Sequence, residues 1–114
     1  AYCGAGRAGA AAGAGIAYLC GGGYEEVIHT VVNALAIVSG MVCDGAKASC
    51  AAKIASSVDA GILGYNMYLR GQQFYAGDGI VTKGVEATIQ NIGRLGKDGM
   101  KETNEEIIKM MISD

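Results

Sequence analysis

Residues 4–19 read "GAGRAGAAAGAGIAYL", and this stretch decides which fold class the chain can adopt. Small residues recur every four positions, at 6, 10 and 14 and again at 5, 9 and 13. On a helix this spacing gives faces without side-chain bulk, so that a neighbouring backbone can approach closely. The alternative is a flexible Gly-rich linker. We favour a helix, because alanines fill its interior, the bulky "IAYL" closes it and "GGG" stops it.

Four more helices are predicted downstream of this one. Their predicted extents are 24–42, 49–70, 82 to the "KDGMKE" at 97–102, and 103 onward. Ser49 and Thr82 are the predicted N-caps of two of them, and Thr103 with Glu106 forms a capping box for the last. No alternating strand pattern occurs in the sequence. The sequence therefore predicts a single all-α segment over residues 1–114, with about five helices around a cysteine-bearing loop.

The overall composition points to a chain that is buried against a partner. Hydrophobic residues make up 51% of the 114 residues, charged residues only 18%, and the net charge is −2. So little charge covers an independent surface poorly. The basic residues are scattered, which argues against nucleic acid as a partner. Because the sequence opens "AYCGAG" without Met, we expect a segment, a processed chain or one subunit of a larger oligomeric protein.

No stretch has the pattern of a membrane span or a signal peptide. The uncharged run 27–43 is about 17 residues long, shorter than the ~20 that a span requires, and it includes His29 and Asn33. The N-terminal residues lack a basic region followed by a Leu-rich one. Four cysteines are too few for a disulfide scaffold. We therefore expect a cytoplasmic protein with no membrane association, in which clustered thiols serve metal binding or chemistry.

The stretch "GAGRAG" at 4–9 matches the Gly-x-Gly-x-x-Gly pattern of dinucleotide-binding folds. Glu25 even lies about twenty residues further on, where such folds place an acidic residue. However, only three residues precede the motif, and "AYLCGGGY" before Glu25 is no second strand. Glycines for close helix packing explain the same residues.

The four cysteines are separated by geometry. Cys3 and Cys20 bracket the first predicted helix, which places them roughly 25 Å apart. Cys43 and Cys50 meet easily across a loop, so a shared site takes both of them and one of Cys3 or Cys20. Cys50 also opens a helix, where free N–H groups favour a thiolate. A metal or cluster, inert buried thiols, a disulfide and a lone catalytic thiol all remain open on spacing alone.

Two lysines and one histidine are further candidates. Lys47 lies between the two loop thiols, and Lys53 lies one turn past Cys50. Either lysine could bind a substrate carboxylate or offset thiolate charge, so both are candidate catalytic residues; the alternative is a solvated side chain. His29 is about 21 Å from Cys43 along a straight helix. This distance is too long for His29 to bind a metal together with Cys43. We predict a histidine in the core whose ring nitrogens are hydrogen-bonded.

A resemblance to a known family is carried by "SGMVCDGAKASCAAKIA" at residues 39–55. This stretch resembles the C-terminal region of the L-cysteine desulfidase and iron–sulfur L-serine dehydratase α-chain family. The segments "CGAGRAGAAAGAGIAYL" and "NIGRLGKDGMKETNEEII" are similar to flanking parts of the desulfidase-like branch. Serine dehydratases proper have a longer gap between the two cysteines and a proline after the Asp, and this sequence departs from them there.

The resemblance implies a [4Fe–4S] cluster and a pyridoxal-independent β-elimination of an amino acid. Cysteine would yield pyruvate, ammonia and sulfide, and serine would yield pyruvate and ammonia. By position, Cys3 and Cys43 match cluster cysteines, Cys50 matches the second thiol of the loop, and Cys20 is left as a core residue. Cofactor binding is therefore expected at Cys3, Cys43 and Cys50.

One departure from the family concerns length. Family members are several-fold longer and carry a Gly-Cys-Thr-Glu-Pro motif in an N-terminal part, which is absent here. The resemblance therefore implies a missing N-terminal part or a partner chain, and an isolated chain that is inactive. The alternatives are a structural or regulatory subunit with buried cysteines and a zinc-binding module.

Overall fold

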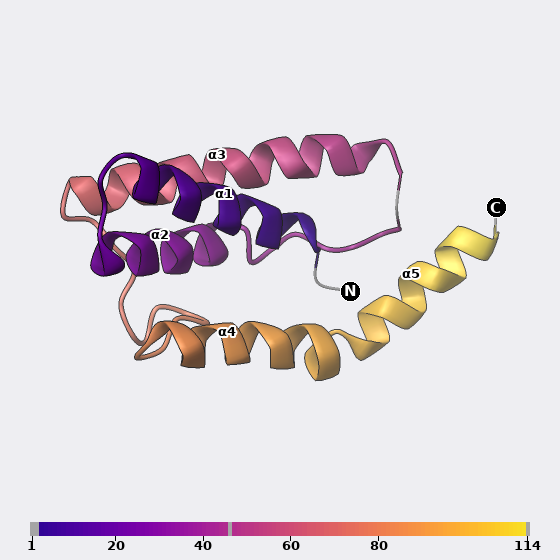
Figure 1. Cartoon of the computed structure of the whole chain (residues 1–114). Coiled ribbons are helices and arrows are strands. Elements are labelled where there is room, and N and C mark those ends of the chain that lie inside the picture. The colour runs from indigo at the N-terminus through magenta and orange to yellow at the C-terminus, as the bar shows by residue number, and fades with distance from the viewer. Residues whose placement is uncertain (1–2, 46, 114) are drawn as a thin grey trace.

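The computed structural model describes residues 3–45 and 47–113, and this part of the chain contains helices and no strand. The elements are α1 (Ala5–Leu19), α2 (Tyr24–Ile37), α3 (Ser49–Leu69), α4 (Val85–Arg94), the π-helical turn η1 (Leu95–Gly99) and α5 (Lys101–Ser113) (Figure 1). The prediction of an all-α chain with about five helices is confirmed.

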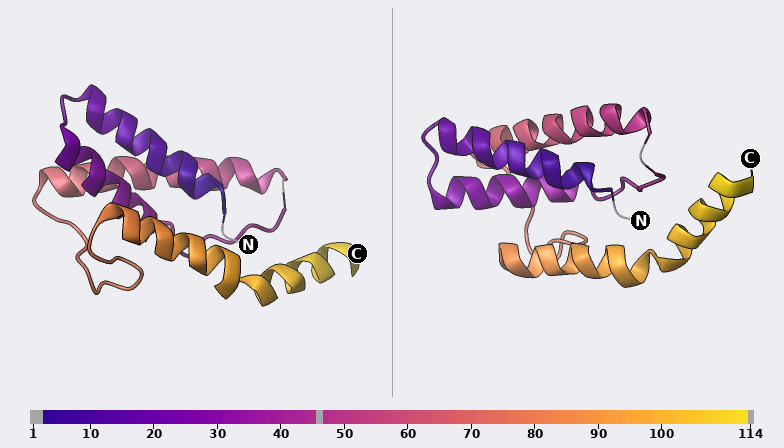
Figure 2. Two further views of the ribbon diagram at one scale, coloured as in Figure 1. Left: turned by 60° about the horizontal axis from the view of Figure 1, so that its bottom comes forward. Right: turned by 45° about the vertical axis from the view of Figure 1, so that its right-hand side comes forward.

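The first three helices pack together, and each of them contacts the other two. α1 and α3 run in the same direction, whereas α2 runs in the opposite one (Figures 1 and 2). The core between them is made of small and medium side chains, with Ala10, Ala34 and Leu35 buried at its centre. As a result, the N-termini of α1 and α3 lie at the same end of the bundle (Figure 1).

Glycines allow α1 and α3 to touch backbone to backbone. A Cβ added to Gly9 would lie 2.0 Å from the Ser57 carbonyl oxygen, and one added to Gly13 would lie 2.7 Å from the Gly61 Cα. Real Cβ atoms do not approach other atoms so closely, so any side chain there would push the helices apart. The predicted close-packing helix is confirmed, and the linker alternative is wrong.

Asn33 fixes α2 to its neighbours through hydrogen bonds in the core. Its side chain is completely buried. Its Nδ2 donates to the Gly64 carbonyl at 3.0 Å, and its Oδ1 accepts the Phe74 N–H at 3.2 Å. Because a buried amide is stable only when it is hydrogen-bonded, these two bonds hold α2, α3 and the segment after α3 in register.

The His29 ring has a polar partner, as predicted, but its side chain lies at the edge of the core and not inside it. Its side chain is 29% exposed, its Nε2 is 3.2 Å from Glu25 Oε2, and its ring stacks on Tyr68 with centroids 5.1 Å apart. His29 lies one helical turn before the buried Asn33.

The predicted helix ends differ from the observed ones at several places. Ser49 is the first residue of α3 and its N-cap is Ala48, and α4 ends at Arg94, before η1. α2 ends at Ile37 rather than at 42, and the N–H groups of Ser39 and Met41 then bond carbonyls three residues back, those of Ala36 at 3.5 Å and Val38 at 3.1 Å. α4 begins after Gly84, whose φ is +93°, and not at Thr82. α5 begins at Lys101, so that the predicted capping box lies inside the helix.

The C-terminal half is attached more loosely than the bundle. α4 contacts α2, and the buried Thr88 ties it to the preceding turn by accepting the Thr82 N–H at 3.1 Å. Among the helical elements, α5 contacts only η1, and it projects from the rest of the molecule (Figure 2). In the described residues, none of the helices combines the length and the apolar character that crossing a bilayer requires.

Candidate functional site

Three of the four cysteines line one pocket at the end of the bundle where α1 and α3 begin. Cys3, Cys43 and Cys50 border a cavity of about 320 Å³. Its other walls are small or apolar residues: Gly4, Ala5, Ala8, Gly45 and Ile54. Cys3 is buried, Cys50 is half-buried and Cys43 is exposed, and all are free thiols. The pocket therefore presents thiols on a wall that otherwise offers few hydrogen-bonding side chains.

The helices place two of these thiols at helix N-termini. Cys3 comes two residues before α1, and Cys50 lies in the first turn of α3. The unpaired N–H groups and the dipole at a helix N-terminus favour negative charge, which includes a thiolate. Both helices begin at this end of the bundle, so their effects act on the same pocket (Figure 1).

The third thiol is supplied by the cysteine loop, by which we mean the described residues 41–45, 47 and 48. The Cys3 N–H donates to the Met41 carbonyl at 3.3 Å, which lays this loop beside the start of α1. Gly45 has a φ of +100°, a conformation that favours glycine, and its carbonyl accepts a hydrogen bond from Cys50 Sγ at 3.4 Å. The loop thus brings Cys43 to Cys3 and Cys50.

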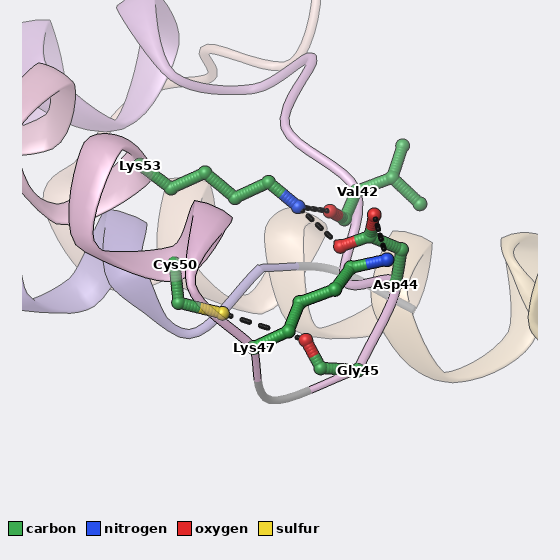
Figure 3. A network of polar contacts seen from close by, with 6 residues as sticks. All are labelled: Val42, Asp44, Gly45, Lys47, Cys50 and Lys53. Carbon is green, nitrogen blue, oxygen red and sulfur yellow. Dashed lines mark hydrogen bonds and ion pairs between the residues drawn. The ribbon is translucent and has the colours of Figure 1, made fainter.

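A network of charged side chains fixes the cysteine loop on α3 (Figure 3). Lys53 of α3 donates to Asp44 Oδ1 at 2.6 Å and to the Val42 carbonyl at 3.0 Å. Lys47 approaches the other carboxylate oxygen, Asp44 Oδ2, at 3.0 Å. One carboxylate therefore holds both lysines that the sequence singled out.

The charged groups in this network shift each other's pKa values. Hydrogen bonds from Lys53 and Lys47 lower the pKa of Asp44 to about 2. The Asp44 carboxylate raises the pKa of Lys53, and the nearby thiols of Cys3 and Cys50 add to the effect by favouring a positive charge. Lys53 is therefore positioned to offset thiolate charge in the pocket.

Lys47 faces a different environment from Lys53. The Lys47 side chain is 51% exposed, whereas that of Lys53 is 23% exposed. Lys47 does not line the cysteine pocket. It borders a neighbouring one of about 260 Å³ between the cysteine loop and α5, with Asp44, Ile107, Met110 and Met111. Its ammonium is directed at Asp44 (Figure 3).

Cys20 lies apart from the other thiols. It follows α1 at the end opposite Cys3 and is exposed, so the prediction of a core position is wrong. The Cys20 N–H closes the helix on the Ile16 carbonyl at 2.9 Å, and the chain then turns through Gly21 with φ +86°. A residue in this turn lies outside the packed face of the helix.

The donor set of the pocket suits an iron–sulfur cluster. Within residues 3–45 and 47–113, no three His, Cys, Asp or Glu side chains are arranged around a common point where a metal ion would fit. The three thiols nevertheless border one cavity that is larger than a single ion needs. Fe–S clusters are held by cysteine thiolates, and a site at two helix N-termini favours their negative charge. The residues present therefore fit such a group.

Two contributors to the site were not identified from the sequence. Asp44 reads as a turn residue before Gly45, although its position between Cys43 and Lys47 was a signal of a charged loop. Met111 of α5 reaches back to the same loop: a Cβ added at Gly45 would lie 2.8 Å from its Cε. No sequence pattern connected α5 with residues so far upstream.

Comparison with known proteins places the chain in a family. The family model described as "Serine dehydratase alpha chain" matches residues 1–109. A "UPF0597 protein" of Desulfitobacterium hafniense is 69% identical over 113 residues, which is 99% of this chain and 26% of the relative. Similar proteins of Lachnoclostridium phytofermentans and Treponema denticola are 55% and 49% identical, over 99% and 100% of this chain and 27% and 26% of theirs.

The chain thus spans about a quarter of the length of the curated relatives that it matches. No solved structure matches it. The family match extends over the cysteine pocket, the cysteine loop and the packed helices. The chain belongs to the serine dehydratase alpha-chain family.

Proposed function

We propose that this chain is the thiol-bearing segment of a pyridoxal-independent amino-acid β-lyase. The observation that carries the proposal is the pocket at which Cys3, Cys43 and Cys50 meet. The reaction would convert L-serine to pyruvate and ammonia, or L-cysteine and water to pyruvate, ammonia and sulfide. The family description names serine, and the resemblance of the cysteine loop to the desulfidase-like branch supports cysteine.

Cys3, Cys43 and Cys50 would hold a [4Fe–4S] cluster in this pocket. When bound, such a cluster supplies a Lewis-acidic iron for the substrate carboxylate and the β-leaving group. The positive ends of α1 and α3 offset the negative charge of the thiolates. The walls of Gly4, Ala5, Ala8 and Ile54 exclude other ligating side chains from this part of the pocket.

The two lysines take different roles in this proposal. Lys53 keeps its ammonium on Asp44 and the Val42 carbonyl and offsets thiolate charge from there. Lys47 is half-exposed, and only Asp44 pairs with it within the described part of the chain. Lys47 borders the neighbouring pocket, so rotation about its side-chain bonds would have to bring its ammonium from Asp44 to a substrate carboxylate at the edge of the cysteine pocket. A cation next to anionic thiolates lowers the free energy of bringing an amino acid there.

The general base that removes the α-proton is proposed to come from outside residues 1–114. The relatives are about four times as long as this chain, so their remaining residues can complete the site. We propose that such a part, on the same polypeptide or on a partner chain, covers the pocket in a cytoplasmic oligomer.

The decisive experiment measures iron in the full-length chain as encoded, prepared anaerobically and reconstituted with iron and sulfide. We expect broad visible absorbance and elimination activity with serine or cysteine, assayed in parallel. Cys43→Ser should lose both iron and activity. Cys20→Ser is the matched control. Cys20 lies at the other end of α1, so this variant should retain both iron and activity. Equal iron loss in the two variants would overturn the ligand assignment.

The same preparation tests the alternatives. A structural subunit with packing cysteines would take up no iron, and a zinc module would show zinc when purified without chelator. The first alternative requires buried thiols, which describes Cys3 but neither the exposed Cys43 nor the half-buried Cys50.

A further inference from the structure

The cysteine loop is joined to α3 by one side chain in particular. Lys53 lies on α3, and its ammonium reaches two acceptors on the loop, the Asp44 carboxylate at 2.6 Å and the Val42 carbonyl at 3.0 Å. These acceptors flank Cys43 on both sides in the sequence. The contact therefore fixes the backbone on either side of that thiol against the helix that carries Cys50 (Figure 3).

We propose that Asp44 is a positioning residue, whose contact with Lys53 holds Cys43 and Cys50 on the same pocket. Asp44 has no role in the chemistry itself. Its carboxylate sets how far the cysteine loop stands from the first turns of α3. The consequence for cluster binding rests on the proposed function, whereas the positioning of the thiols does not.

Lys47 cannot perform the same task, although it contacts the same carboxylate. Lys47 lies three residues after Asp44, before α3 begins, so their contact links the loop only to itself. Its side chain is also twice as exposed as that of Lys53. Exposed ion pairs of this kind contribute little to holding a backbone in place. Lys47 is therefore the natural comparison for the role of Lys53.

Thiol labelling tests the proposal without a cluster. Metal-free full-length protein is reacted with iodoacetamide, and the rate at Cys50 is followed by mass spectrometry. We expect both Asp44→Asn and Lys53→Met to raise this rate about fivefold, as when one partly exposed ion pair that favours a closed form is lost. Lys53→Arg should restore the slow rate, because a guanidinium can reach both acceptors.

The two substitutions separate loop opening from a change in thiol acidity. Removing the negative charge of Asp44 favours the reactive thiolate, whereas removing the positive charge of Lys53 disfavours it. Only loop opening raises the rate in both variants. Cys20 is the internal control for the reagent and pH, because it is exposed at the far end of α1 and its rate should be the same in every variant. The helical circular dichroism signal of each variant reports whether the bundle is intact.

Each outcome decides between the possibilities. A Cys50 rate unchanged in Asp44→Asn, or raised as much by Lys47→Met as by Lys53→Met, would overturn the positioning role. Iron content after reconstitution is measured on the same variants and should fall with Asp44→Asn and Lys53→Met but not with Lys53→Arg. If the parent protein binds no iron, the proposed function fails, while the labelling pattern still decides the role of Asp44.

Discussion

Lys47 is the residue whose proposed role in substrate binding can be tested most directly. It follows the first loop thiol in the sequence, and in the structure its ammonium rests on Asp44 with half of its side chain in solvent. We predict that Lys47→Met keeps the iron content of the full-length protein and lowers kcat/KM. The expected loss is about 1.5–3 kcal/mol, the range for a hydrogen bond to a charged group.

Lys109→Met is the matched control for this measurement. Lys109 also forms an exposed ion pair with an acid three residues away, Glu106. It lies on α5 and borders neither the cysteine pocket nor the pocket beside Lys47. Its removal should leave kcat/KM unchanged. Full iron together with unchanged kinetics in Lys47→Met would exclude the substrate-binding role, and iron loss would instead assign Lys47 to the support of the cluster.

Single residues of the site were predictable where their spacing carried the information. The helix rise alone separates Cys3 from Cys20, and the short loop brings Cys43 to Cys50. The partner of Asp44 was not predictable, because Lys53 reaches it only after the loop has folded back on α3. The exposure of Cys20 was missed because residue spacing does not tell which way a helix end turns.

The packing of α1 on α3 gives a sharp test at the level of the element. A Cβ at Gly9 would meet the Ser57 backbone at 2.0 Å, whereas one at Gly15 on the same helix has no atom within 4 Å. Gly9→Ala should therefore lower the free energy of unfolding by ~1–3 kcal/mol through overpacking. Gly15→Ala should raise it by about 0.5–1 kcal/mol, because alanine restricts the unfolded chain and favours helix.

Chemical denaturation of the two variants in the full-length protein measures this pair of opposite effects. If Gly9→Ala stabilised the protein as Gly15→Ala does, the contact between the α1 and α3 backbones would not exist in solution.

Helices were easier to predict than their ends. The Gly and Ala spacing of α1 and the apolar repeat of α2 belong to long stretches, and their signal accumulates over many residues. An end depends on one or two local bonds, such as those of the Ser39 and Met41 N–H groups to carbonyls three residues back, which follow the end of α2 at Ile37. The approach of Met111 on α5 to Gly45 depends on a contact between distant residues, which no local pattern encodes.

At the scale of the molecule, three large apolar side chains are strongly exposed beside the turn between α1 and α2. Tyr18, Leu19 and Tyr24 gather around the turn between α1 and α2, and their exposed fractions are 73%, 84% and 76%. We predict that residues 1–114 produced alone self-associate at micromolar concentration, because such a patch gains free energy when water is excluded from it. The full-length protein should cover this patch.

Light scattering during size-exclusion chromatography compares the two forms. Replacement of Tyr18 and Leu19 by serine should restore a monomer if the patch drives association, and Ile108→Ser on α5 serves as a control at another exposed apolar site. A monodisperse monomer of the unmodified segment would contradict the prediction.

The thiol pocket joins the starts of two helices that are far apart in the sequence, so it is completed late during synthesis. Cys50 leaves the ribosome about 50 residues after Cys3, a delay of about 2–10 s at typical elongation rates. During that time α1 has emerged without Ser57 and Gly61, against which it packs, and Cys3 lacks its pocket neighbour Cys50. If the proposed function holds, a cluster bound by all three thiols can be completed only after the start of α3 has emerged.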